Sequence, residues 1–301
     1  MDTKEKSHRP LPSCPLCPLW FATRVACAML AAFLFVRPAS AQQRPLITED
    51  PETIGAGRLL IEGGVDVTRD QQYPVSGLEG NLLRVPTIGL SIGISSIAEI
   101  QIDGGLNNRL HITKRTVAPL SSELTVTGDS TRDVEDTVIA TKVRLLTETA
   151  GRPAFGLRFA TKLPNASNEK GLGLDTTDFY MSVLAAKTVQ SIRIVGNFGV
   201  GILADPTQGH RQNDVATYGL SFARAMTQQA ELVGELNGRA STRNGGPLPG
   251  TESRGVLRLG GRYTRGTVRL DAGVLFGLTT VDPTIGLTVG FTYVFNAFTI
   301  P

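Results

Sequence analysis

From about residue 57 onward, hydrophobic and polar residues alternate with a period of two, in segments of roughly 9 to 13 residues. In one well-phased segment, Phe155, Leu157 and Phe159 fall on one face, while Arg158 and Lys162 fall on the other. This period is typical of β-strands rather than helices. The segments that follow it are 57–68, 82–94, 98–110, 136–147, 153–163, 178–188, 192–203, 214–225, 230–239, 253–263, 267–278 and 283–295.

The connections between these twelve segments alternate between short and long. Those after the even segments are tight turns, and the long polar ones cover 69–81, 111–135, 164–177, 204–213, 240–252 and the shorter 279–282. Short turns at one rim, long loops at the other and an even strand number are typical of bacterial outer-membrane barrels. The sequence therefore predicts an all-β fold, a transmembrane antiparallel up-and-down β-barrel of about twelve strands with both termini in the periplasm.

The two phases of the alternation differ in charge. A Lys or Arg that faces lipid at mid-bilayer costs about 2–4 kcal/mol, so the apolar phase should face the membrane and the charged phase the lumen. The lumen-lining residues predicted in this way are Glu62, Arg84, Glu99, Asp103, Lys142, Arg144, Arg158, Lys162, Arg193, Glu231, Glu235, Arg254, Arg258, Arg262, Arg269 and Asp271.

Two interpretations of these charges remain open. Acidic and basic residues on neighbouring strands, such as Glu235 and Arg258, pair with each other and fill a narrow interior. Alternatively, they form a charged wall that selects solutes in a water-filled pore. Because arginine outnumbers the acids on the segments 253–263 and 267–278, a weak anion preference is a further hypothesis.

The N-terminal 41 residues have the pattern of a cleaved signal peptide. Basic residues precede an apolar run at 25–36 that is too short to span about 30 Å of hydrocarbon as a helix, and Ala39-Ser40-Ala41 predicts cleavage before Gln42. The mature chain then consists of residues 42–56, read as a periplasmic segment or a small plug, a barrel at 57–295 and a tail at 296–301. We therefore expect export to the cell outer membrane.

Removing residues 1–41 changes the composition. This segment holds all three cysteines, five of the 30 Lys and Arg residues and two of the 27 Asp and Glu residues, which leaves 25 of each charge. A neutral mature chain gives no reason to expect a nucleic-acid partner. The expected partners are outer-membrane lipid and lipopolysaccharide, the barrel assembly machinery and a small-molecule solute.

The mature sequence contains no pattern that predicts an enzyme, a cofactor or a metal site. His111 and His210 fall in or beside long loops without the hydroxyl neighbour that nucleophilic catalysis needs, and the cluster of His210 with Asp205 and Asp214 is read as ordinary loop polarity. The acidic residues of the second long loop are read as solvated, with calcium binding as the alternative. They are Asp129, Asp133, Glu135 and Asp136.

Several segments resemble one family, the MetA-pathway of phenol degradation family of outer-membrane proteins. The similar segments are RPLITEDPETIGAGRLLIEGG at the mature start, VPTIGLSIGISSIAEIQIDGG with Pro86, Gly89, Ile94, Glu99 and Ile100, TKLPNASNEKGLG with Lys162, Leu163, Pro164 and Gly171, and TIGLTVGFTYVF with Phe291, Tyr293 and Phe295. The resemblance implies a barrel that passes small compounds, with aromatic ones as candidates, and it supplies no catalytic or ligand-binding residues.

The sequence thus predicts an outer-membrane channel or transporter that passes small solutes, aromatic or anionic compounds among the candidates, by passive diffusion. The alternative is a non-conducting barrel with a structural, adhesion or partner-docking role.

Overall fold

The computed structural model describes residues 44–299, so the predicted signal peptide at 1–41 lies outside the described residues. The only helix in the described part is the three-residue η1 (Ser121–Glu123), and no helix there is long and apolar enough to cross a membrane. The strands are β1 (Arg58–Tyr73), β2 (Leu78–Gly93), β3 (Ala98–Gly105), β4 (Asn108–Arg115), β5 (Ser130–Asp133), β6 (Val138–Leu146), β7 (Ala154–Lys162), β8 (Asp178–Val189), β9 (Ile192–Ala204), β10 (Gln212–Ala225), β11 (Ala230–Ser241), β12 (Arg254–Arg265), β13 (Val268–Gly277) and β14 (Ile285–Asn296).

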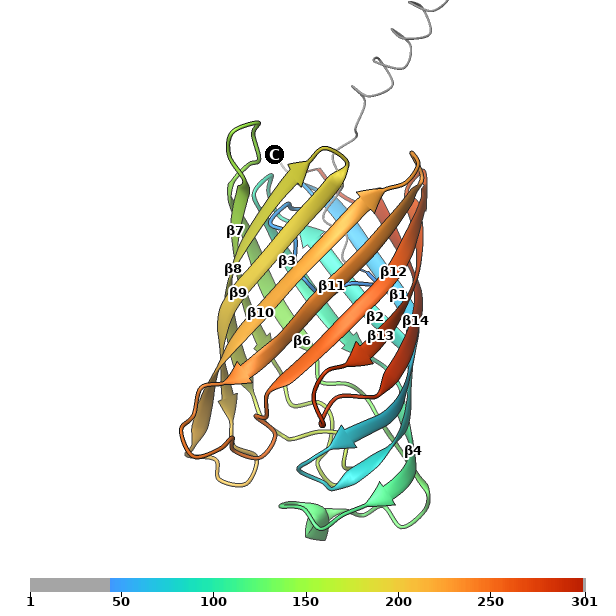
Figure 1. Cartoon of the computed structure of the whole chain (residues 1–301), viewed down its shortest axis with the longest axis vertical. Coiled ribbons are helices and arrows are strands. Elements are labelled where there is room, and N and C mark those ends of the chain that lie inside the picture. Colours follow the sequence, from blue (N-terminus) through green and yellow to red (C-terminus); the bar gives the residue numbers. More distant parts are fainter. Residues whose placement is uncertain (1–43, 300–301) are drawn as a thin grey trace, which may run out of the picture. The chain divides into compact units, whose positions relative to one another are not determined.

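Twelve of these strands form a closed antiparallel barrel, which confirms the predicted fold and strand number (Figure 1). Neighbours in the chain are neighbours in the sheet, and the barrel closes because β1 pairs with both β14 and β2. Leu60, for example, lies opposite Val294 on one side and Ser91 on the other. Closure leaves the wall without an unpaired sheet edge, as a membrane interior requires.

Three predicted ranges were wrong. The expected loop at 69–81 is a tight turn at 74–77, because β1 and β2 run on past the predicted ends. The predicted strand 98–110 is divided into β3 and β4, which pair with successive parts of β2, and the expected loop at 111–135 contains the end of β4, η1 and β5. We call β4, β5 and the paired end of β2 the extension sheet.

The extension sheet continues past the rim of the barrel, where a small hydrophobic core of its own stabilises it. Leu78, Leu82, Leu110 and Ile112 are buried together on its inner face. Their alternation with polar residues continues the strand pattern past the rim, and burying a large apolar side chain stabilises by about 1.5–3 kcal/mol. Because polar residues lie between these apolar ones, part of this segment was predicted to be a loop.

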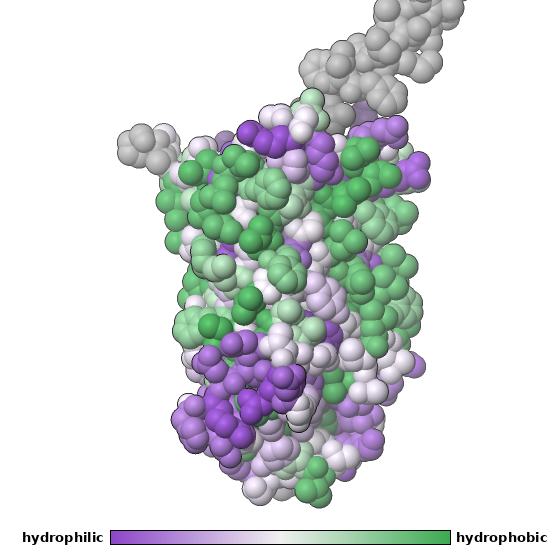
Figure 2. All heavy atoms as spheres, turned by 60° about the vertical axis from the view of Figure 1, so that its left-hand side comes forward, coloured by the Kyte–Doolittle hydropathy of each residue, from purple (hydrophilic) through white to green (hydrophobic). Residues whose placement is uncertain are grey.

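The outer wall of the barrel exposes large apolar side chains. Phe198 is 66% exposed, and Leu220 and Leu287 are each 57% exposed. Figure 2 shows this apolar surface on one side of the barrel, with hydrophilic residues gathered toward the rims. So large an exposed apolar surface is stable only against another apolar medium, as lipid is.

Candidate functional site

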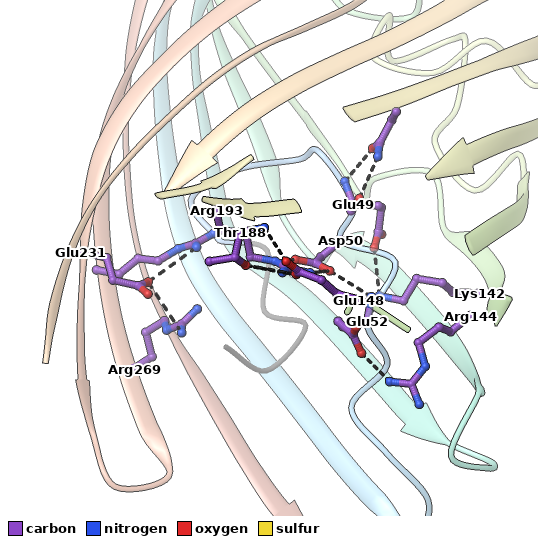
Figure 3. Close-up of polar contacts among 12 residues, drawn as sticks. Glu49, Asp50, Glu52, Lys142, Arg144, Glu148, Thr188, Arg193, Glu231 and Arg269 are labelled. Carbon is purple, nitrogen blue, oxygen red and sulfur yellow. Dashed lines mark hydrogen bonds and ion pairs between the residues drawn. The ribbon is translucent and has the colours of Figure 1, made fainter. Parts of the chain in front are cut away.

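The interior of the barrel contains residues 44–57, here called the inner segment (Figures 1 and 3). Its residues bond in turn to different parts of the wall. Arg44 contacts β14, Ile47 contacts β11, Glu49 contacts β9 and Ile54 contacts β3. Bonds to strands spaced around the closed wall place the segment within the lumen.

Three wall side chains hold the backbone of the inner segment. The carboxylate of Glu235 accepts hydrogen bonds from the N–H groups of residues 47 and 48, at 2.9 and 2.8 Å. Asn197 donates to the carbonyl oxygen of Glu49 and accepts from its N–H, both at 2.7 Å. The Glu99 carboxylate accepts from the N–H of Ile54 at 2.7 Å. The wall thus supplies the bonds that a neighbouring strand would otherwise give.

Glu49 forms ion pairs with two bases of the wall. Its carboxylate lies 3.3 Å from the Lys142 ammonium and 3.1 Å from Nε of Arg158. Lys142 also lies 3.0 Å from the Glu99 carboxylate, and both of these side chains are fully buried. Since a buried charge needs a nearby opposite charge, Glu49 is an integral part of this group.

The other two acids of the segment pair with arginines (Figure 3). Asp50 accepts hydrogen bonds from Nε and Nη2 of Arg193, the second at 2.7 Å. Glu52 accepts from Nη1 of Arg144. Two-point bonding of a guanidinium to a carboxylate is among the strong polar contacts in proteins.

The one base of the segment, Arg44, meets the acids of the opposite wall. Its guanidinium donates to the hydroxyls of Thr87 and Thr288, each at 2.9 Å, and lies 3.6 Å from Asp66 and 3.5 Å from Asp271. The charges of the segment are therefore sorted along its length to match the wall. Ten basic and six acidic residues were predicted for the lumen, and the three acids of the segment offset part of that excess.

Glycines in the wall make room for the inner segment. A Cβ atom at Gly93 would lie 1.8 Å from the carbonyl oxygen of Gly55, and one at Gly219 would lie 2.9 Å from Oγ1 of Thr48. A Cβ at Gly64 would lie 2.2 Å from the Arg44 guanidinium. The wall is thus shaped to the backbone of the segment at some positions and to its side chains at others.

Gly93→Ala is expected to lower the free energy of unfolding by about 1–3 kcal/mol, because the added methyl group meets backbone atoms that cannot move alone. Gly196→Ala is the matched control, since a Cβ there meets nothing within 4 Å and the change should stay within about 0.5 kcal/mol. Urea unfolding in detergent micelles measures both. Equal effects of the two substitutions on the free energy of unfolding would show that the close backbone approach at Gly93 does not limit the side chain there.

The remaining predicted lumen residues bond to partners in the wall or the loops. Their partners come from strands, from loops and from the turns that cover the long-loop rim. The pairs are Glu62 with Thr292, Arg84 with Asp66 and Glu135, Asp103 with Arg158, Lys162 with Asp136 and Asp178, Arg254 with Asp282, Arg258 with Glu235 and Asn237, and both Arg262 and Arg269 with Glu231.

Glu148, in the short turn between β6 and β7, extends this network to the short-turn rim. Its carboxylate bonds to the N–H of Thr188 at 2.8 Å and pairs with Arg193 at 3.0 Å. Burial alone would raise the pKa of Glu148, but the bonds from Thr188 and Lys187 and the Arg193 charge outweigh it and hold the pKa below the ordinary 4.5. Its stabilising effect is thus present near neutral pH and is lost as the pH falls through this lowered pKa.

Three of the four loop carboxylates considered for calcium pair with different cations. Asp133 pairs with Lys170, Glu135 with Arg84 and Asp136 with Lys162. Among residues 44–299, no three His, Cys, Asp or Glu side chains gather as metal ligands. At the opposite loop, Asp205 bonds to Arg211 at 2.9 Å rather than to a histidine.

Sequence reasoning did not assign a role to the charges of the inner segment itself. The signal was present as a basic Arg44 followed by an acidic run at 49–52, in a chain whose predicted lumen has more bases than acids. The charges of the inner segment complement those of the predicted lumen, and this complementarity could have predicted that the segment lies inside the barrel.

Neither a protein-family model nor a curated protein matches this sequence, so the family resemblance rests on the quoted motifs. Among solved structures, the translocator domain of the autotransporter NalP from Neisseria meningitidis is 14% identical, with a TM-score of 0.43 over 92% of this chain and 97% of that one. The CymD monoaromatic hydrocarbon channel is 9% identical, with a TM-score of 0.42 over 82% and 91%. The Pseudomonas putida toluene transporter TodX is 8% identical, with a TM-score of 0.40 over 83% and 92%. What this chain shares with them is the barrel fold.

Proposed function

We propose that this protein is an outer-membrane channel for small molecules and that the inner segment is a plug that closes it. The observation that best supports this proposal is that ion pairs and hydrogen bonds hold most of the plug in place. Of its apolar side chains, Pro45, Leu46, Pro51 and Ile54 are buried and Ile47 is 54% exposed, and Ile54 belongs to a small cluster of buried apolar residues with Leu60 and Val294. Buried ion pairs add little net stability compared with apolar packing, so a permanent filling would be expected to be apolar. Charged groups can instead exchange their partners for water when the plug moves.

Displacing the plug would leave a basic wall facing water. Lys142, Arg144, Arg158 and Arg193 would lose the plug carboxylates, and Glu99, Asp103 and Glu148 would remain to offset three of these four charges. Fixed charges on a pore wall favour ions of opposite sign, so the open channel should prefer anions. The family resemblance and the names of TodX and CymD make monoaromatic compounds, and anionic ones in particular, the first solutes to test.

The variant Glu49→Gln/Asp50→Asn/Glu52→Gln is expected to raise conductance in planar bilayers at least about hundredfold. Each charge-assisted hydrogen bond that is lost contributes about 1.5 kcal/mol or more, and about 4 kcal/mol in total corresponds to a thousandfold change in the plug equilibrium. Single-channel recording and liposome swelling with benzoate measure the change.

Asp70→Asn/Asp129→Asn/Asp175→Asn is the matched control, because it removes three exposed carboxylates that do not contact the plug. It should leave the conductance unchanged. A correctly folded plug variant that stays silent, as judged by heat-modifiable migration on a gel, would reject the channel.

A non-conducting barrel is the second candidate, and the long-loop rim favours it. Leu248 and Thr251 are buried there, and the Ser76 hydroxyl donates to the carbonyl oxygen of Gly171 at 2.8 Å, so loops as well as the plug cover the interior. Under this alternative, the barrel acts through its loops. Its expected result is silence in both the wild type and the plug variant.

A further inference from the structure

Two arginines lie directly opposite each other in the extension sheet. Arg109 of β4 and Arg132 of β5 are register partners, and both are exposed. Their neighbours Leu110 and Thr131 are buried on the inner face. Because successive side chains of a strand point to opposite faces, the two guanidinium groups belong to the outer face of the sheet.

Neither arginine has an acidic partner. Within residues 44–299, no carboxylate lies at ion-pair distance from Arg109 or Arg132, since Asp133 pairs with Lys170 at 3.2 Å and Glu79 of β2 pairs with Lys114. Like charges directly opposite across two strands destabilise the pairing. The intramolecular contacts therefore do not account for this arrangement, and an external anion would remove the repulsion.

The arginines adjoin the apolar outer wall. In register with Arg109 lie Leu83 of β2 and then Val67 of β1, which is 44% exposed. Leu106, just before β4, is 61% exposed. Arg69 lies two residues beyond Val67 and is also exposed, at the long-loop end of its strand. Cationic and apolar surfaces thus meet at the edge of the lipid-facing wall.

We propose that Arg109 and Arg132 bind a phosphate group of lipopolysaccharide in the outer leaflet. The planar guanidinium fork matches phosphate oxygens in two-point bonds. An amphiphile fits better than a free anion, because its acyl chains would lie along the exposed apolar residues beside the pair. The assignment also sets the orientation of the barrel, with the long loops on the lipopolysaccharide side of the membrane.

The test compares the affinity of the purified full-length barrel for phosphorylated lipopolysaccharide with its affinity for the same lipid after chemical dephosphorylation. We expect the wild type to prefer the phosphorylated lipid at least about tenfold, and Arg109→Gln/Arg132→Gln to lose that preference. Arg109→Lys/Arg132→Lys keeps the charge without the fork and should lose part of it. This second variant also serves if the first one folds poorly.

Arg224→Gln/Arg265→Gln is the matched control, because it removes two exposed arginines near the short-turn rim. It should keep the full preference. Equal binding of both lipids by the wild type, or an equal loss in the control, would overturn the proposal. Displacement of the lipid by inorganic phosphate at the same concentration would identify a free-anion site and would also overturn it.

Discussion

A disulfide between positions 48 and 219 is expected to abolish the conductance gained by the plug variant Glu49→Gln/Asp50→Asn/Glu52→Gln. A Cβ atom at Gly219 of β10 would lie 3.5 Å from Cβ of Thr48, within the 3.5–4.5 Å range usual for disulfides. All three cysteines of the sequence precede residue 42, so the predicted mature chain would contain this pair alone. Oxidation would fix the plug to the wall even though its ion pairs are gone.

The measurement is bilayer current before and after reduction of Thr48→Cys/Gly219→Cys in that background. The oxidised channel should fall to the level of the unmodified protein, and dithiothreitol should restore the current. The current through each single-cysteine variant should be the same before and after reduction. Unchanged current through a protein shown by mass to be cross-linked would mean that solutes pass without plug movement.

Lys142→Met is expected to destabilise the folded barrel by about 3–5 kcal/mol. Lys142 is fully buried between Glu49 and Glu99, so its removal leaves the buried Glu99 carboxylate without a cation and leaves Glu49 with Arg158 alone. A methionine fills a similar volume, and the effect is therefore electrostatic rather than one of packing. Urea titration of the barrel in micelles gives the change in the free energy of unfolding.

Lys170→Met is the control for this loss of a charge. Lys170 pairs with Asp133 in a loop and its side chain is half exposed, so its removal should cost about 1 kcal/mol or less. If the two variants lose the same free energy of unfolding, the buried ion pairs of Lys142 with Glu49 and Glu99 do not stabilise the barrel more than an exposed pair does.

The wall of the barrel was predictable because its signal is local. Phe155, Leu157 and Phe159 alternate with smaller or charged residues at a period that only a strand satisfies. Segment ends were harder, since the extension sheet keeps the alternation of a strand around Leu110 and Ile112 but has a polar composition. Only its packing against Leu78 and Leu82 shows that these residues are not a loop.

The plug contacts were not predictable in the same way. Glu235 binds the N–H groups of residues 47 and 48 across 188 and 187 positions of the chain, and a backbone N–H has no sequence signature. The fit at Gly93 depends on a backbone approach that is visible only in three dimensions. The sequence could identify charges that need partners, but not which charges meet.

The short connection between the plug and β1 determines how a displaced plug returns to the lumen. Gly55 and Gly57 have φ values of +90° and +70°, which glycine adopts at little cost, and residue 58 already belongs to the wall. A ligand tethered this closely rebinds in a first-order step, at an effective concentration in the millimolar range set by the tether. Reclosure should thus be independent of protein dilution, and a free peptide of the same sequence would compete only at comparable millimolar concentrations.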